Sequence, residues 1–124
     1  AFDMCRDLNE ALEDAKKLGV VSILSSGGYA SAKEGAAVLD ELKKNAGTID
    51  IMAGAGMNAQ NIEFMLNHTS LTAFHMSGKK TLESKMQYRN SRINMGLPSL
   101  SEYEIIQTDT EAVRAAKEIL NRWK

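Results

Sequence analysis

Apolar positions along the first half of the chain follow two periods, and the change between them predicts helices separated by strands. Apolar residues three and four positions apart follow Asp7, and Glu10 completes a capping box with it. We expect this helix to end at Leu18, because Gly19 stands where a helix C-cap belongs. Residues 20–24 are rich in β-branched side chains and predict the next strand.

The same unit recurs along the chain. A second capping box, from Ser31 to Glu34, predicts a helix that continues to Gly47. The further predicted elements are a strand at 49–53 that is buried on both faces, a helix from about Asn58 to Leu66, and a strand at 71–76. Residues 1–4 predict the end of one more strand.

Strands that alternate with helices predict an α/β fold with a parallel sheet and right-handed crossovers. Two architectures satisfy this order: an open, doubly wound sheet, or part of a (β/α)8 barrel. A chain of 124 residues is expected to form one domain, 1–124, with a core of its own.

The tail of this domain, 79–124, follows a different pattern. Residues 78–101 show no clear periodicity and begin with a basic stretch, which predicts a functional or disordered segment. Residues 103–107 are compatible with a short strand or an extended segment. A third capping box, from Thr108 to Glu111, predicts a final helix through Leu120.

Composition excludes several classes of function. The formal net charge of −1 gives no general attraction to nucleic acid. No apolar run approaches the length of about 18 residues that a membrane span requires. Cys5 is the only cysteine and has no internal disulfide partner, which fits a reducing cytoplasm.

The glycines after the 49–53 strand indicate an anion site. Gly54-x-Gly56 resembles a dinucleotide fingerprint, but residues 74–76 lack the carboxylate that this motif requires about 20 positions later. A phosphate-type site fits better, built from Gly54 and Gly56 and from the next strand end, Ser77-Gly78-Lys79. The structural alternative is that the glycines only form tight turns.

Two side chains at predicted strand ends are candidates for acid–base chemistry, Asp3 and His75. The structural alternative for Asp3 is a carboxylate bonded to the following turn, and the alternative for His75 is a core histidine. Ser25 and Ser26 are expected to line a pocket or cap a helix. The adjacent Met4 and Cys5 are soft ligands of the kind that favours Cu(I), although methionine is also a common core filler.

Several motifs together resemble one family. They are Ala-Phe-Asp-Met-Cys at 1–5, Ile-Leu-Ser-Ser-Gly at 23–27, Ile-Met-Ala-Gly-Ala-Gly at 51–56, Phe-His-Met-Ser at 74–77 and Ser-Lys-Met-Gln-Tyr-Arg-Asn at 84–90. They closely resemble the copper homeostasis protein CutC family. The resemblance implies a cytoplasmic (β/α)8 barrel of the TIM type, of which this chain is similar to the C-terminal half. It also implies that a His-Arg pair precedes Ala1 in the family pattern.

The resemblance implies a role in copper homeostasis, with direct Cu(I) binding as one form of it and Met4 and Cys5 as the ligands. An enzyme acting on a small phosphorylated or carboxylated substrate is the alternative, and a binding protein without chemistry is a third. A barrel requires about 250 residues. We therefore expect a fragment or a piece of a longer protein, or two associating half-barrels. We expect a homo-oligomer, and a dimer is the favoured oligomeric state.

Overall fold

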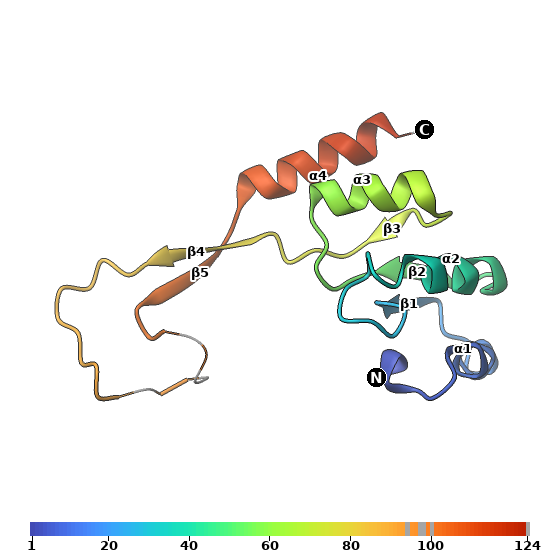
Figure 1. Cartoon of the computed structure of the whole chain (residues 1–124), viewed down its shortest axis with the longest axis horizontal. Helices are drawn as coiled ribbons and strands as arrows, with labels where there is room; N and C mark the ends of the chain where they lie inside the picture. The colour runs from blue at the N-terminus through green and yellow to red at the C-terminus, as the bar shows by residue number, and fades with distance from the viewer. Residues whose placement is uncertain (94, 97–98, 100, 124) are drawn as a thin grey trace.

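The computed structural model describes residues 1–93, 95–96, 99 and 101–123. Figure 1 shows a body of strands and helices from which a long arm extends. The elements in chain order are η1 (Phe2–Met4), α1 (Leu8–Lys17), β1 (Ser22–Ser25), α2 (Ala36–Asn45), β2 (Asp50–Ala53), α3 (Ala59–His68), β3 (Ala73–Phe74), β4 (Lys79–Glu83), β5 (Glu104–Thr108) and α4 (Thr110–Arg122).

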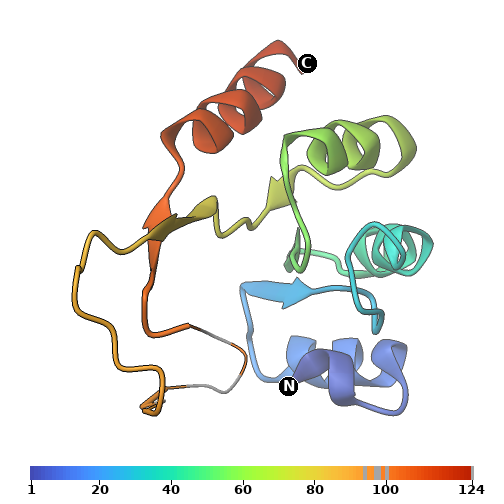
Figure 2. The same cartoon turned by 60° about the vertical axis from the view of Figure 1, so that its left-hand side comes forward.

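The body is built on a parallel sheet in the order β1-β2-β3. Ile23 pairs with Ile51, and Met52 pairs with Ala73. Helices α1, α2 and α3 lie on one side of this sheet, as Figure 2 shows. The predicted α/β class, with parallel strands alternating with helices, is therefore confirmed.

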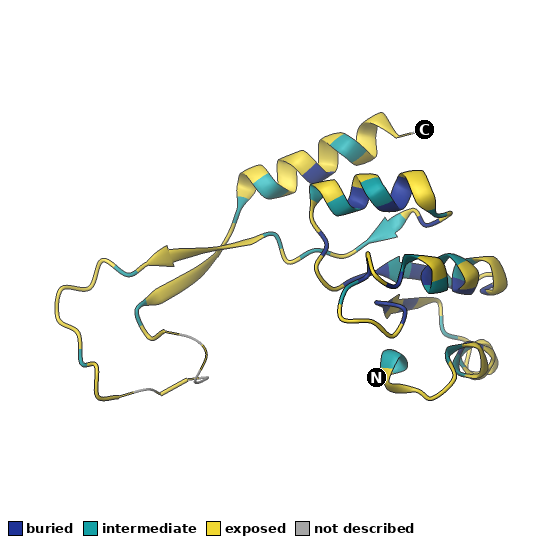
Figure 3. Cartoon of the chain, in the orientation of Figure 1, coloured by how far each residue is buried: buried dark blue, intermediate teal, exposed yellow. Residues whose placement is uncertain are grey.

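The hydrophobic core lies between this sheet and its helices, and Figure 3 shows the buried residues there. Its most deeply buried large apolar side chains are Leu12, Leu39, Leu42, Ile51, Ile62, Met65 and Leu71. Along β2, the buried Ile51 and Ala53 alternate with the half-buried Asp50 and Met52. The prediction that this strand is buried on both faces was therefore wrong, because the helices in the described part of the chain cover one face of the sheet.

Helix boundaries are set by hydrogen bonds that the apolar pattern only partly indicates. The Asp7 side chain accepts from the N–H groups of Asn9 and Glu10, as the first capping box predicted. The second helix begins at Ala36 rather than beside Ser31, although the Ser31 hydroxyl accepts from the N–H of Glu34. For α4, the capping side chain is Asp109 and not Thr108.

Two predicted strands differ in the structure. Residues 1–4 do not end a strand: Phe2–Met4 form a 3-10 helix, held by bonds from Met4 N–H to the Ala1 carbonyl and from Cys5 N–H to the Phe2 carbonyl. The strand expected at 71–76 is shorter, Ala73–Phe74, because only these residues pair with β2.

The stretch after Gly78 contains a strand that the sequence did not predict. β4 pairs antiparallel with β5, from Lys79 opposite Thr108 to Glu83 opposite Glu104. We call these two strands and the described residues between them the arm. The part of the prediction for 78–101 that concerns residues 94, 97–98 and 100 lies outside the described residues. The short strand expected at 103–107 is confirmed as β5.

The chain returns from the arm to the body through α4. This helix packs on α3, and Ala116 is buried in the contact. None of the helices in the described part of the chain has the length and apolar content needed to cross a membrane.

Candidate functional site

The carboxyl ends of β1, β2 and β3 carry the polar loops of the body. Parallel strands end at the same edge of a sheet, so the loops that follow them are neighbours. Ligands bind at this edge in α/β proteins. Most of the site residues expected from the sequence lie on these loops.

Asp3 is tied to the loop after β1. Its carboxylate accepts a hydrogen bond of 2.6 Å from the Ser25 hydroxyl and bonds of 3.0 Å from the N–H groups of Ser26 and Gly28. The Ser25 hydroxyl also accepts from the N–H of Gly27, at 2.9 Å. The carboxylate thus joins η1 to β1 across 22 residues of sequence.

These contacts set the charge state of Asp3. Burial raises the pKa of its carboxyl group, but the bonds from Ser25, Ser26 and Gly28 together outweigh burial and hold the pKa below its ordinary value. At neutral pH Asp3 is therefore an ionised acceptor. The structural alternative for Asp3 was a bond to the turn that follows it in the chain, whereas the observed bonds go to the loop after β1.

The loop after β2 has a tight geometry at Gly54. Its N–H donates to the Ser25 carbonyl at 3.0 Å, so this donor serves the contact with β1. A Cβ at this position would lie 2.6 Å from Cδ1 of Leu24. The missing Cβ at Gly54 therefore leaves room for the Leu24 side chain, whereas the positive φ of a tight turn is found at Gly56.

The next residues present backbone donors. Ala55 and Gly56 have positive φ angles of 81° and 68°. Among the described residues, the N–H groups of Ala55, Gly56 and Met57 donate to no protein acceptor. Successive backbone donors with such dihedral angles form concave anion-binding nests.

Ala55, Gly56 and Met57 line a hollow together with residues that follow β3. Its volume is about 180 Å³, and its other lining residues are His75, Met76 and Ser77. His75 is exposed, and its backbone N–H donates to the Ala53 carbonyl at 2.8 Å. The structure thus brings together His75, Gly56 and Ser77 from the set that the sequence singled out.

Other expected anion ligands lie elsewhere. Gly54 does not line this hollow, and neither do Gly78 and Lys79. The Gly78 carbonyl accepts from the N–H of Asp109 at the base of the arm. Lys79 is the first residue of β4 and is exposed.

Met4 and Cys5 lie at the end of η1. Met4 is 88% exposed, and Cys5 is an exposed free thiol. Cys5 lines a separate, largely apolar groove of about 540 Å³, between η1, α1 and β1. Within the described residues, no group of three or more His, Cys, Asp or Glu side chains could hold a metal ion.

Sequence reasoning missed two features of this edge. The bond between Asp3 and Ser25 was not predicted, because nothing local in the sequence links residues so far apart. Ala55 and Met57 were not singled out either. The Gly-x-Gly spacing before the N-cap Asn58 was the available signal, since it marks a turn with positive φ that opens a helix.

The fold and this edge define the chain as an α/β protein with loops at the carboxyl ends of parallel strands. A sequence model described as the CutC family matches residues 1–80. Relatives named family protein CutC are 40% identical to the chain. The one from Bacteroides fragilis aligns over 92% of this chain and 46% of its own length. Those from Vibrio campbellii and Pasteurella multocida align over 98% and 99% of this chain and 49% and 50% of their own.

The chain belongs to the CutC family, as the motifs at 1–5, 23–27, 51–56 and 74–77 indicated. It spans about half the length of the curated relatives that it matches.

Proposed function

We propose that the chain is part of a cytoplasmic copper homeostasis protein of the CutC type that binds Cu(I) directly through Met4 and Cys5. The observation that carries this proposal is the exposure of two adjacent soft ligands within the region that matches the family. Thioether and thiolate sulfur atoms favour Cu(I) over harder ions. No backbone movement is needed to make either sulfur accessible.

An anaerobic Cu(I) competition titration against a colorimetric chelator tests this proposal. We expect the chain to take up Cu(I), and Cys5→Ser to lose most of this competition. Met4→Leu is expected to weaken binding, whereas Met95→Leu, which removes a methionine that is 84% exposed in the arm, serves as the matched control. Equal binding by Cys5→Ser and the unmodified chain would contradict the assignment.

A second candidate function rests on the hollow after β2 and β3. Its unpaired backbone donors and His75 suit a small anion, such as a phosphorylated or carboxylated substrate. In this alternative the chain is part of an enzyme, with His75 as the acid–base group at the hollow; Asp3, the other acid–base candidate, lies outside it at the loop after β1. Gly56 and Ser77 would bind the anion, whereas the other predicted anion ligands, Gly54, Gly78 and Lys79, lie outside the hollow. A binding protein without chemistry would use the same hollow.

Calorimetric titration with inorganic phosphate separates this alternative from copper binding. We expect His75→Ala and Ser77→Ala to reduce phosphate binding if the hollow is the site, and Cys5→Ser to leave it unchanged. His68→Ala is the control, because that ring stacks on Phe64 and its Nδ1 bonds to the Phe64 carbonyl on α3. No phosphate binding by the unmodified chain would remove this alternative.

The proposal includes a fold for the whole protein. Residues 1–124 would form one unit, the C-terminal part of a TIM-type (β/α)8 barrel, with the tail from residue 79 onward. Support comes from the parallel order β1-β2-β3, from helices on one face of the sheet, and from the share of the relatives that the chain spans. The uncovered side chain of Leu24, 52% exposed, would face the barrel interior.

A further inference from the structure

The arm presents a sheet edge that the described part of the chain leaves open. All five residues of β4 and all five of β5 are exposed. Figures 1 and 2 both show the two strands away from the helices of the body. A two-stranded hairpin alone is marginally stable in water, and an unpaired edge is a template for a further strand.

The hydrogen bonds at the two ends of the hairpin identify the residues on the open edge of β4. Ser84 N–H donates to the Tyr103 carbonyl, and Asp109 N–H donates to the Gly78 carbonyl, both at 2.6 Å. In an antiparallel pair, backbone groups point alternately toward the partner strand and away from it. Lys79, Thr81 and Glu83 therefore point their N–H and C=O groups outward.

This outward set is complementary to itself. If a second β4 lies antiparallel with Thr81 opposite Thr81, then Lys79 lies opposite Glu83 of the second copy, and Glu83 lies opposite Lys79. Opposite charges and Thr–Thr pairs at directly facing positions stabilise a sheet. The same arrangement places Lys80 opposite Leu82, so the lysine stem covers an apolar side chain that is 39% exposed.

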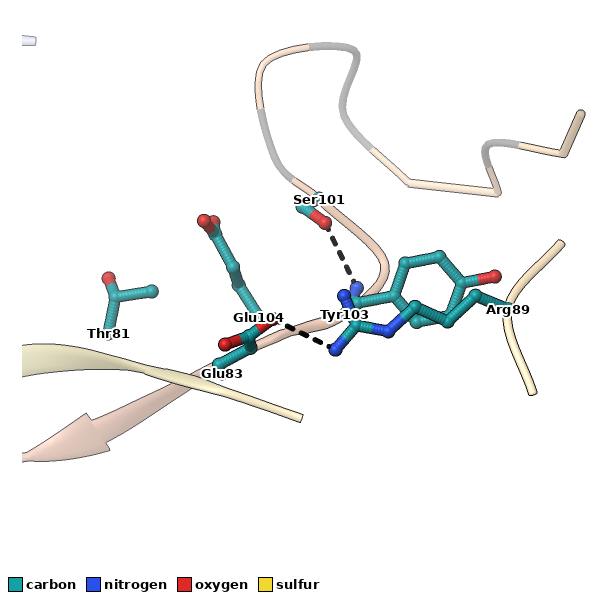
Figure 4. Close-up of a pocket in the computed structure, with 6 residues that line it drawn as sticks. All are labelled: Thr81, Glu83, Arg89, Ser101, Tyr103 and Glu104. Atoms are coloured by element: carbon teal, nitrogen blue, oxygen red, sulfur yellow. Dashed lines mark hydrogen bonds and ion pairs between the residues drawn. The ribbon is translucent and has the colours of Figure 1, made fainter. Parts of the chain in front are cut away.

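The charged groups are available for these contacts. Among the described residues, the Lys79 ammonium group makes no ion pair. Glu83 Oε1 accepts from Nη2 of Arg89 at 3.0 Å, and its other oxygen has no partner in the described chain. Figure 4 shows Arg89 beside Glu83, with its side chain directed toward Tyr103. The Arg89 pair holds Glu83 near the edge without using both carboxylate oxygens.

The other edge of the arm lacks this complementarity. On β5 the outward residues are Glu104, Ile106 and Thr108. Antiparallel pairing of two β5 strands centred on Ile106 places Glu104 opposite Thr108 and forms no ion pair. Pairing of β4 with β5 of another copy is head-to-tail and leads to a ring or an open filament, whereas β4 with β4 closes as a two-fold dimer.

We propose that β4 is a dimerisation edge: two copies of this chain pair antiparallel through β4 about Thr81. The two arms then form one four-stranded sheet in the order β5-β4-β4-β5. Figure 4 shows the face of the arm that carries Thr81, Glu83 and Glu104, and this face becomes continuous across the two copies.

Charge reversal tests the register. Light scattering after size-exclusion chromatography, over a series of concentrations, is expected to show a reversible dimer. Lys79→Glu places two Glu–Glu pairs across the edge, and we expect it to weaken the dimer about tenfold or more. Combining Lys79→Glu with Glu83→Lys restores opposite charges and is expected to recover the dimer. Lys85→Glu makes the same charge change at an exposed position beyond the end of β4 and is the matched control.

Proline substitution tests the edge itself. Thr81→Pro removes an outward N–H without removing a bond to β5, so the arm is retained and the dimer is lost. Ile106→Pro makes the equivalent change on the β5 edge and is expected to leave the dimer intact. Far-UV circular dichroism checks that both variants fold.

Three results would overturn the proposal. The first is the mass of a single chain at every concentration. The second is a dimer that Ile106→Pro abolishes and Thr81→Pro does not. The third is a dimer that resists all of these changes, which would place the contact on the sheet of the body and favour the association of half-barrels.

Discussion

The body and the arm differ in what holds their strands in place. In the body, Ile51 is fully buried beneath helices, and its strand β2 pairs with β1 on one side and with β3 on the other. In the arm, β4 and β5 have one partner each, and every residue of both strands is exposed. Strands are paired in both regions, and the larger difference between the regions lies in apolar burial. The comparison indicates that the body supplies the stability of the chain, whereas the arm is available for contacts beyond it.

Truncation of one isoleucine in each region gives the largest expected effect. Ile51→Ala removes a side chain with 0% exposure and is expected to lower the free energy of unfolding by about 2–5 kcal/mol. Ile106→Ala removes one that is 52% exposed and is expected to change it by less than about 0.5 kcal/mol. Urea denaturation of both variants measures the difference. Equal losses would show that the arm folds as part of the same core.

The same contrast explains which parts of the fold the sequence predicted. Helix α1 is encoded locally: Asp7 caps it, apolar residues recur at helical spacing, and Gly19 follows it with a φ of 72°. β4 was missed because Lys79, Lys80 and Glu83 show no buried face, and its partner β5 lies more than 20 residues further along the chain. Pairing of this kind is non-local, and no short sequence window contains it.

The candidate site also has one part that the local sequence predicts and another that depends on non-local contacts. Loops at strand ends could be predicted, because Gly54 and Gly56 follow an apolar strand and His75 follows the next. Lys79 was grouped with them by sequence proximity alone, yet the chain enters β4 there and Lys79 does not line the hollow. The contact of Asp3 with Ser25 depends on how η1 meets β1, which local patterns do not determine.

A polar contact within the body gives the second prediction. Asp40 on α2 accepts from the Lys44 ammonium group at 2.6 Å, and from the N–H and hydroxyl of Ser70, both at 2.7 Å. The bond from Lys44, followed by those from Ser70, lowers the pKa of Asp40 from 3.8 to about 2. The ionised carboxylate therefore joins α2 to the segment that leads into β3.

The direction of the pH dependence follows from this shift. Because the folded-state pKa is the lower one, the unfolded chain binds the proton more tightly, and stability is lost as the pH falls. The contribution is complete above pH 3.8 and disappears as the pH falls through about 2. Asp40→Asn is expected to cost about 1 kcal/mol at pH 7, because solvent weakens a contact near the surface.

Urea denaturation between pH 2 and pH 7 measures this effect. The difference between the unmodified chain and Asp40→Asn should narrow as the pH approaches about 2. Asp14→Asn is the control, because the carboxylate of Asp14 is 62% exposed and its one ion pair among the described residues is with Lys17 on the same helix. A difference that stays constant with pH would show that the charge of Asp40 does not stabilise the body.

The smallest expected effect concerns Arg89, which organises the tip of the arm. Its Nη2 donates to Glu83 at 3.0 Å and to the Ser84 carbonyl at 3.1 Å, and its guanidinium carbon lies 5.0 Å from the centre of the Tyr103 ring (Figure 4). Arg89→Lys keeps the charge but removes the planar group that makes these contacts together. We expect the free energy of unfolding to change by less than about 0.5 kcal/mol, because this side chain is 41% exposed.

The local consequence should nevertheless be visible. Amide hydrogen exchange at Ser84 and Asn90 is expected to accelerate in Arg89→Lys, while exchange at Ile51 in β2 stays unchanged. Measurement at low protein concentration keeps any pairing between arms out of the comparison. Faster exchange at Ile51 as well would show that loosening of the arm propagates into the sheet, and the two regions would then have to be treated as one cooperative unit. If only the amides of the body stay protected from exchange, the stability of the body is assigned to the core around Ile51. The arm is then a separate unit that a binding partner could order.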